Sequence, residues 1–228
     1  LRNQLALLID ELNKMTSVKV IILTGAGERA FSAGLDLKEL STNEDTLKSI
    51  YDRKRFTDPV ESIKNLTKPI ICAVNGVAIT GGFELAINCD IVVGSRNAAF
   101  ADTHSLVGVL PAWGLSQKLS ELIGFSRAKE LSLSGRFIYA EEALSWGLIN
   151  SIQEPGNLLN YVSKIAKGIA KNDLKFISEY KKLIDRGNNL RMKESLLLES
   201  KVSKEWNLKL KPEVLGEKVD KIFEKSRK

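Results

Sequence analysis

The sequence predicts an α/β fold followed by a helical C-terminal region. Three short segments rich in β-branched residues, at 18–24, 70–77 and 91–93, have the composition of buried strands. Stretches with helical spacing of apolar residues separate these segments, and this alternation is typical of a core with mostly parallel strands. After Pro155 the pattern is helical almost throughout.

The N-terminal elements are expected from local patterns. Residues 1–15 place leucines and a methionine at helical spacing, which predicts an amphipathic helix. The segment 18–24 is closed by Gly25-Ala26-Gly27, as expected of a strand that ends in a turn. Further helices are expected at 43–65 and from Gly82 onward.

The second half of the chain contains more helices than strands. We expect short helices at 126–134 and 140–146 and a strand at 148–152. Longer helical patterns then occupy 157–171, 173–186, 190–208 and 212–226. The change in pattern predicts two regions, an α/β core at 1–155 and a helical region at 156–228.

Length and cysteine content favour a soluble, intracellular protein. A chain of 228 residues can bury one substantial core. No apolar stretch approaches the ~20 residues of a membrane helix, and no targeting segment is visible. Cys72 and Cys89 lie in apolar segments, which favours buried free thiols over a disulfide. We therefore expect a cytoplasmic protein.

The net charge of +6 does not by itself indicate a nucleic-acid partner. Lysines and arginines are interleaved with acids, and their enrichment near the C-terminus favours a solvated helix face. An anionic small ligand such as a nucleotide diphosphate is the alternative. The one histidine and two separated cysteines form no metal-ligand pattern, so neither a metal nor nucleic acid is expected.

Two segments combine small residues with unpaired backbone donors. Phe31-Ser32-Ala33-Gly34-Leu35-Asp36-Leu37 lacks bulk, so a ligand could approach its N–H groups. A turn before a helix capped by Asp36 is the alternative. Thr80-Gly81-Gly82-Phe83-Glu84 begins a helix whose N-terminal amides could stabilise a negative oxygen. Glu84 could move a proton there, or could simply satisfy the helix dipole.

The sequence resembles the enoyl-CoA hydratase/isomerase (crotonase) family. The resemblance is strongest at 20–150 and thin in the C-terminal helices. It rests on these segments in order: Ala33-Gly34-Leu35-Asp36, Ala73-Val74-Asn75-Gly76, Gly81-Gly82-Phe83-Glu84-Leu85-Ala86, Cys89-Asp90-Ile91, Phe100-Ala101-Asp102-Thr103-His104 and Gly108-Val109-Leu110-Pro111. It implies a spiral of ββα units that binds an acyl-CoA thioester.

The resemblance also assigns roles to single residues. The backbone N–H groups of Leu35 and Gly81 would hold the thioester oxygen, and Glu84 matches the first of two glutamates that hydratases use. The second glutamate position is occupied by His104, which can exchange a proton near neutral pH. If 100–104 is a strand, Asp102 lies on the same face and could orient the imidazole. A purely structural histidine is the alternative.

Further positions would contact the substrate. Ala33, Asp36 and Leu37 match residues that line the coenzyme A site. Trp113 falls in a segment that borders the acyl pocket, where it could limit acyl length or pack in the core. Lys225 lies where a basic residue helps to hold coenzyme A phosphates, although an exposed tail lysine is an equal alternative.

The resemblance thus predicts an enoyl-CoA hydratase that needs no cofactor beyond the coenzyme A of its substrate. An enoyl-CoA isomerase and a non-catalytic acyl-CoA-binding subunit are the alternatives. Family members assemble as trimers or pairs of trimers through their C-terminal helices, so a homotrimer or dimer of trimers is expected. Relatives usually begin with a strand hairpin, whereas this sequence starts at the helix, so one wall of the coenzyme A site is expected to lie outside it.

Overall fold

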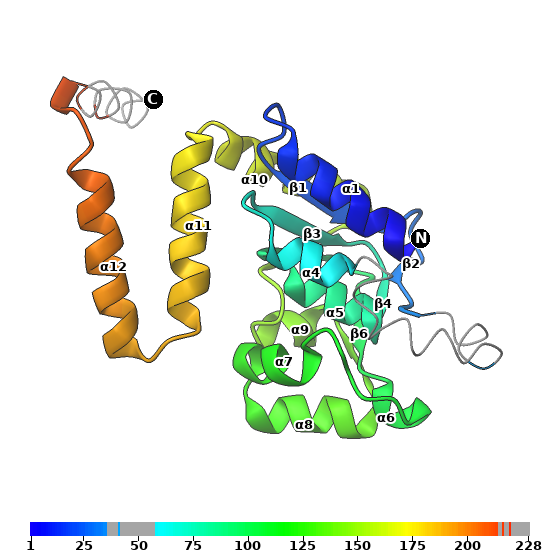
Figure 1. The fold of residues 1–228 in the computed structure, drawn as a ribbon. Helices are drawn as coiled ribbons and strands as arrows, with labels where there is room; N and C mark the ends of the chain where they lie inside the picture. The colour runs from blue at the N-terminus through cyan, green and yellow to red at the C-terminus, as the bar shows by residue number, and fades with distance from the viewer. Residues whose placement is uncertain (36–40, 42–57, 214–215, 217–218, 220–228) are drawn as a thin grey trace. The chain divides into compact units, whose positions relative to one another are not determined.

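The computed structural model describes residues 1–35, 41, 58–213, 216 and 219. The chain forms two compact units, Leu1–Ile177 and Ser178–Lys228, and its fold is drawn in Figure 1. The strands are β1 Ile21–Thr24, β2 Ala30–Ser32, β3 Ile70–Val74, β4 Val77–Ile79, β5 Ile91–Ser95, β6 Ala99–Ala101, β7 Phe137–Tyr139 and β8 Ser151–Gln153. The helices are α1 Arg2–Lys14, α4 Pro59–Lys64, α5 Gly81–Asn88, α6 His104–Val107, α7 Leu115–Ile123, α8 Phe125–Ser134, α9 Ala140–Ser145, α10 Leu158–Ala170, α11 Leu174–Asn188 and α12 Met192–Asn207, with a 3-10 turn at Pro155–Asn157.

The strands of the first unit form two four-stranded sheets. One has the order β1-β3-β5-β8 and is parallel throughout. The other has the order β2-β4-β6-β7, and only its last pair is antiparallel. The pairs β1–β2, β3–β4 and β5–β6 each place one strand in each sheet, and helices separate or follow these pairs. This arrangement confirms the spiral of ββα units that the resemblance implied.

The single strand predicted at 70–77 is wrong. The segment 70–77 contains β3 and the start of β4, which lie in different sheets. The chain breaks at Asn75, whose side chain accepts a hydrogen bond from Gly25 N at 3.0 Å and donates to Gly27 O at 2.7 Å. At Gly76 a Cβ would lie 2.4 Å from the carbonyl oxygen of Arg29. Contacts with a distant loop therefore divide the two strands.

The other predicted elements agree with the structure to different degrees. Four predicted elements are confirmed, with every end within two residues of its predicted position: the first helix, the strand at 91–93 and the helices at 126–134 and 140–146. The strand predicted at 148–152 begins later, at Ser151. Of the helix predicted at 43–65, the described part is α4, and most of the helix predicted at 212–226 lies outside the described residues.

The parallel sheet is buried on both faces, which explains why β3 is apolar at every position. Ile70, Cys72 and Val74 face a cluster that includes residues of α1, α4 and α5. The alternating residues Ile71 and Ala73 face α10 instead. The parallel sheet is therefore held between helices, whereas the residues considered below follow β2, β4 and β6 of the other sheet.

The structural boundary differs from the one predicted near Pro155. Leu158 and Val162 of α10 are buried against the parallel sheet, with Ile165 and Ile169 packed beside them. This contact places α10 in the first unit, which continues to Ile177. The amphipathic pattern of α10 is accounted for by its own sheet.

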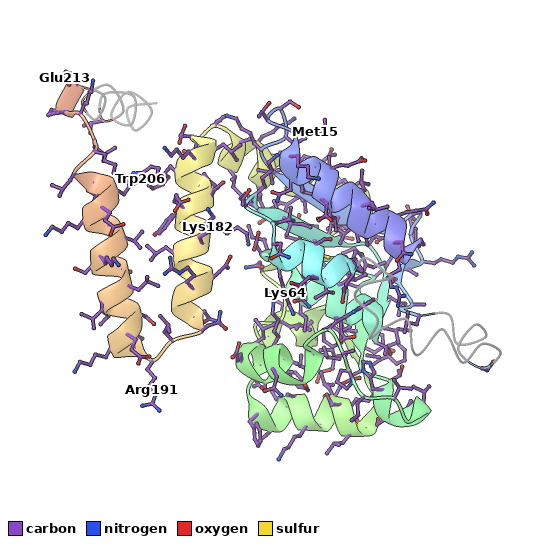
Figure 2. The ribbon with its side chains drawn as sticks, viewed as in Figure 1. Met15, Lys64, Lys182, Arg191, Trp206 and Glu213 are labelled. Carbon is purple, nitrogen blue, oxygen red and sulfur yellow. The ribbon has the colours of Figure 1, made fainter. Side chains whose placement is uncertain are left out.

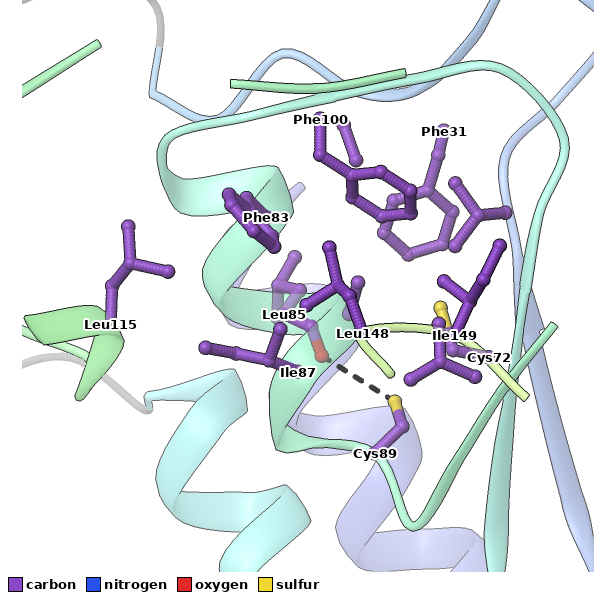
Figure 3. Packing of buried hydrophobic residues seen from close by; sticks show 14 of the residues in the cluster. Phe31, Cys72, Phe83, Leu85, Ile87, Cys89, Phe100, Leu115, Leu148 and Ile149 are labelled. Atoms are coloured by element: carbon purple, nitrogen blue, oxygen red, sulfur yellow. Dashed lines mark hydrogen bonds between the residues drawn. The ribbon is translucent and has the colours of Figure 1, made fainter. Parts of the chain in front are cut away.

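The centre of the first unit is drawn in Figure 3, where aromatic and aliphatic side chains fill the space around α5. The rings of Phe83 and Phe100 lie 5.3 Å apart between centroids. Cys72 and Cys89 are both buried and free, as predicted, and the Cys89 thiol lies 3.4 Å from Leu85 O.

The second unit contains α12 and all but the first turn of α11. Neither helix has a buried residue among those described. Ser195 at the start of α12 donates its hydroxyl proton to Gly187 O at 2.7 Å. Figure 2 labels Lys182 on α11 and Trp206 near the end of α12. Within the described ranges, no helix combines the length and hydropathy needed to cross a membrane.

Candidate active site

Two backbone N–H groups, those of Leu35 and Gly81, lie close together. A Cβ on Gly34 would lie 2.9 Å from the amide nitrogen of Gly81. A Cβ on Gly81 would in turn lie 3.3 Å from Gly34 Cα and 3.8 Å from Leu35 N. Within the described part of the chain, neither N–H group donates a hydrogen bond. Both donors therefore remain available to a ligand.

Local contacts hold these two loops against each other. The hydroxyl of Ser32 accepts a hydrogen bond from Gly34 N at 3.2 Å, which stabilises the turn after β2. A Cβ on Gly82 would lie 2.1 Å from Ser32 O, so α5 can begin this close to β2 only with glycine there. The close approach of two backbones requires the small residues that the sequence provides at both places.

Glu84 is buried on α5, with 3% of its surface exposed. Its Oε1 accepts hydrogen bonds from Trp113 N at 2.9 Å and Leu115 N at 3.3 Å. Burial raises the pKa of Glu84, and these bonds together with nearby His104 offset only part of that effect. The carboxyl group is thus held in place through its Oε1, and it binds a proton more readily than a free glutamate does.

His104 and Asp102 form a buried pair. His104 Nδ1 lies 2.7 Å from Asp102 Oδ1, and the same oxygen accepts a hydrogen bond from His104 N at 3.2 Å. Burial alone would raise the pKa of Asp102, but hydrogen bonds from His104 and Ser132 lower it overall. The anionic form of Asp102 is therefore favoured, and we assign the proton of this contact to His104 Nδ1.

The contact was predicted, but its predicted geometry is wrong. Residues 100–104 do not form one strand, because β6 ends at Ala101 and His104 begins α6. The pair forms because Asp102 accepts a hydrogen bond from the backbone N–H two residues later, in the manner of an Asx turn.

Glu84 and His104 face each other across a short gap. His104 Nε2 lies 3.9 Å from Glu84 Oε2, and both side chains are almost fully buried. This distance is too long for a direct hydrogen bond, but it is short enough for one water oxygen, about 2.8 Å from each atom, to bridge them. The two groups can therefore act on one small molecule between them.

The comparisons with known proteins agree with this geometry. Residues 1–225 match the family model described as enoyl-CoA hydratase/isomerase. The sequence is 42% identical over 196 residues to a protein of Arabidopsis thaliana named probable enoyl-CoA hydratase 1, peroxisomal, covering 86% of this chain and 72% of that protein. It is 38% identical over 195 residues to the short-chain-enoyl-CoA hydratase of Clostridium acetobutylicum, covering 84% and 73%.

A solved structure shows the same likeness. The enoyl-CoA hydratase of Bacillus anthracis matches with a TM-score of 0.86 at 31% identity, over 96% of this chain and 84% of that one. The chain belongs to the enoyl-CoA hydratase/isomerase family. The resemblance inferred from the sequence motifs is thereby confirmed.

Trp113 lies next to Gly81, one of the two paired amides. The residue is 8% exposed and belongs to the core cluster. Its Cζ3 atom would lie 3.3 Å from a Cβ on Gly81. Trp113 therefore packs in the core and also borders Gly81, while its backbone N–H holds Glu84. A role in limiting acyl length remains a prediction.

The predicted coenzyme A contacts are only partly described. Ala33 is exposed directly before Gly34, and its contact with the ligand remains a prediction. Asp36, Leu37 and Lys225 lie outside the described residues. Among the described residues, no group of three or more His, Cys, Asp or Glu side chains is placed to hold a metal ion.

Several residues of the site were missed by the sequence analysis. Ser132 reaches Asp102 from α8, and Asn88 donates hydrogen bonds to Glu84 O at 2.7 Å and Trp113 O at 3.0 Å. The spacing of Asn88, one helical turn after Glu84, was a usable signal. Nothing in the sequence indicated Ser132, because its contact joins segments distant along the chain.

Proposed function

We propose that this member of the enoyl-CoA hydratase/isomerase family hydrates 2-enoyl-CoA thioesters to 3-hydroxyacyl-CoA. The observation that carries the proposal is the pairing of two unoccupied backbone donors, Leu35 and Gly81, with a buried Glu84 and His104 that face each other. The names of the relatives in Arabidopsis thaliana and Clostridium acetobutylicum support the same reaction.

The paired amides would stabilise the charge that develops in the reaction. When water adds to the β-carbon of an unsaturated thioester, electrons shift toward the carbonyl oxygen. The N–H groups of Leu35 and Gly81 would hold that oxygen in a site already arranged for it. One such donor typically contributes on the order of 10²–10³ in rate.

The two buried side chains would orient the attacking water. With the proton of the contact to Asp102 assigned to Nδ1 of His104, Nε2 is an acceptor in that tautomer. Oε2 of ionised Glu84 is a second acceptor 3.9 Å away. A water that donates one hydrogen to each acceptor keeps a lone pair free to attack the β-carbon.

The proton transfers balance within the Glu84–His104 pair. The water oxygen bonds to the β-carbon and keeps one hydrogen as the new hydroxyl group. The Glu84–His104 pair takes up the other hydrogen and returns it to the α-carbon, which restores the thioester carbonyl. The overall change is the addition of one water, so we propose no cofactor beyond the coenzyme A carried by the substrate. General acid–base help of this kind contributes about 10²–10⁴ in rate.

The finer assignments belong to the same proposal. We infer assembly as a homotrimer or a dimer of trimers, supported by the exposed apolar residues of the second unit, which include Tyr180, Ile184, Leu196 and Leu197. Light scattering after gel filtration tests this assembly. We also place the protein in the cytoplasm, supported by its two free thiols.

Product analysis in isotopically labelled water tests the reaction. The protein is incubated in H₂¹⁸O with a series of 2-enoyl-CoA thioesters, and the products are identified by mass spectrometry. The expected product gains one water and carries ¹⁸O at its hydroxyl group. A shifted double bond without gain of mass would identify an isomerase instead. Binding without any turnover would identify a non-catalytic acyl-CoA-binding subunit.

A further inference from the structure

Thr80 has a backbone conformation that its residue type disfavours. Its φ is 51° and its ψ is −109°, and it is the only non-glycine with positive φ among the described residues. A β-branched residue in this region is strained and persists only where the surroundings enforce the conformation. Thr80 immediately precedes Gly81, so its ψ sets the orientation of the Gly81 amide.

Three hydrogen bonds hold Thr80 in this conformation. Its N–H donates to Ala101 O at 2.9 Å, and its carbonyl accepts from Glu84 N at 2.9 Å. Its hydroxyl shares a hydrogen bond with the hydroxyl of Thr103, with the two oxygens 2.5 Å apart. The first two bonds continue a sheet and a helix, whereas the third joins two side chains.

The hydroxyl bond connects the two halves of the candidate site. Thr80 lies directly before Gly81, one of the two donors for the thioester oxygen. Thr103 lies directly before His104, which faces Glu84. The bond therefore joins the segment that holds the carbonyl oxygen to the segment that holds the water.

We propose that the Thr80–Thr103 hydroxyl pair is a positioning device that fixes the Gly81 amide relative to the His104 imidazole. The proposal rests on the proposed hydration, in which the carbonyl oxygen and the attacking water must be placed together. Neither threonine touches the reacting atoms in this role. Each acts through its neighbour in the chain.

Substitutions on both sides of the bond test the proposal. Thr80→Val and Thr103→Val remove one hydroxyl each and keep a branched side chain of similar volume. Each is expected to lower kcat by about 10- to 100-fold, because small displacements of aligned groups have effects of this order. KM should change by less than about twofold, because ground-state binding does not depend on the alignment.

Three further variants separate positioning from general stability. The double variant should lose no more kcat than the worse single variant, since both remove the same bond. Thr80→Ser keeps the hydroxyl and should retain most of kcat. Thr67→Val is the matched control, because it removes the hydroxyl bond to Asn13 Oδ1, 3.0 Å long, outside the candidate site. It should lower the melting temperature and leave kcat unchanged.

Wild-type kcat in both single valine variants, or independent losses that multiply in the double variant, would show that the bond does not position the two groups. If Thr80→Val does not fold, Thr103→Val decides alone, since Thr103 has an ordinary φ of −94°.

NMR signals of His104 and Gly81 test the positioning role independently of hydration activity. His104 is the only histidine, so its ring gives one set of ¹H–¹⁵N signals. Thr80→Val is expected to shift the His104 ring signals, and Thr103→Val is expected to shift the Gly81 amide signal. Shifts confined to the substituted loop would overturn the proposal, even in a protein that turns over no enoyl-CoA. Failure of wild-type hydration alone would overturn only the proposed function.

Discussion

Replacing Gly34 by alanine tests whether the amides of Leu35 and Gly81 act as the oxyanion site. The added Cβ would lie 2.9 Å from Gly81 N, 3.0 Å from Ile79 O and 3.3 Å from Gly81 Cα. All three neighbours are backbone atoms, which cannot turn aside as a flexible side chain could. The methyl group must therefore push the two loops apart or shield the Gly81 amide.

The size of the effect has two parts. Gly34 has a φ of +82°, and alanine in the left-handed region costs roughly 1–2 kcal/mol of stability. Loss of one oxyanion donor lowers kcat by about 10²–10³. The backbone conformation thus affects the stability of the fold, whereas the loss of the donor affects kcat.

Gly27→Ala is the control for the backbone part. Gly27 has a similar φ of +73°, and nothing lies within 4 Å of an added Cβ. In urea unfolding, both variants should therefore lose a comparable amount of stability from the left-handed backbone conformation. Only Gly34→Ala should lose further stability from steric strain. Only Gly34→Ala should lose kcat in the spectrophotometric assay of enoyl-CoA hydration. Equal kcat in the two variants would refute the oxyanion assignment.

Three more substitutions test other parts of the account. Glu84→Gln should lower kcat by about 10²–10⁴. This variant should also become more stable relative to wild type as pH rises. Burial raises the pKa of Glu84 in the folded protein above its unfolded value near 4.5. The wild type therefore loses stability as pH rises from the unfolded pKa to the folded pKa. Thermal unfolding from pH 4 to pH 8 measures this, and a difference in melting temperature that is constant over that range would contradict it. His104→Gln should lower kcat by about 10²–10⁴ with little change in KM, and steady-state kinetics with full activity would assign His104 a structural role. Lys68→Met should destabilise the fold by about 1–3 kcal/mol without changing kcat, because Lys68 Nζ donates to Leu12 O at 2.6 Å and Met15 O at 2.5 Å at the C-terminal end of α1. A cooperative urea transition at the wild-type midpoint would contradict this.

Local patterns predicted the elements whose cause is local. The first helix and α5 have clear helical spacing or a glycine start, and both were found where expected. The segment 70–77 contains Asn75-Gly76, a turn signal that the single predicted strand overlooked, and β3 and β4 lie on either side of it in different sheets. That break depends on contacts of Asn75 with a loop almost 50 residues away.

The candidate site shows the same limit. The Asp102–His104 contact was predicted from strand alternation, yet an Asx turn before a helix produces it. The anchoring of Glu84 by Trp113 N and Leu115 N joins positions 29 and 31 residues apart, which no local pattern shows. The positive φ of Thr80 was also hidden, since threonine does not suggest such a conformation.

The amphipathic pattern of α10 illustrates a different difficulty. Its apolar face predicted a helix correctly, and the helical region was assigned to contacts between subunits. The face instead covers the parallel sheet of the same chain through Leu158 and Val162. A periodic pattern shows that a face is buried, but it does not identify the surface that buries it.

The polarisation of the bound thioester carbonyl tests the central claim most directly. A 2-enoyl-CoA labelled with ¹³C at the carbonyl can be bound to Glu84→Gln, which should turn it over slowly enough for ¹³C NMR. We expect a downfield shift on binding that becomes much smaller in Glu84→Gln/Gly34→Ala. An equal shift in both proteins, or no shift in either, would contradict the assignment of Leu35 and Gly81 as the donors to that oxygen.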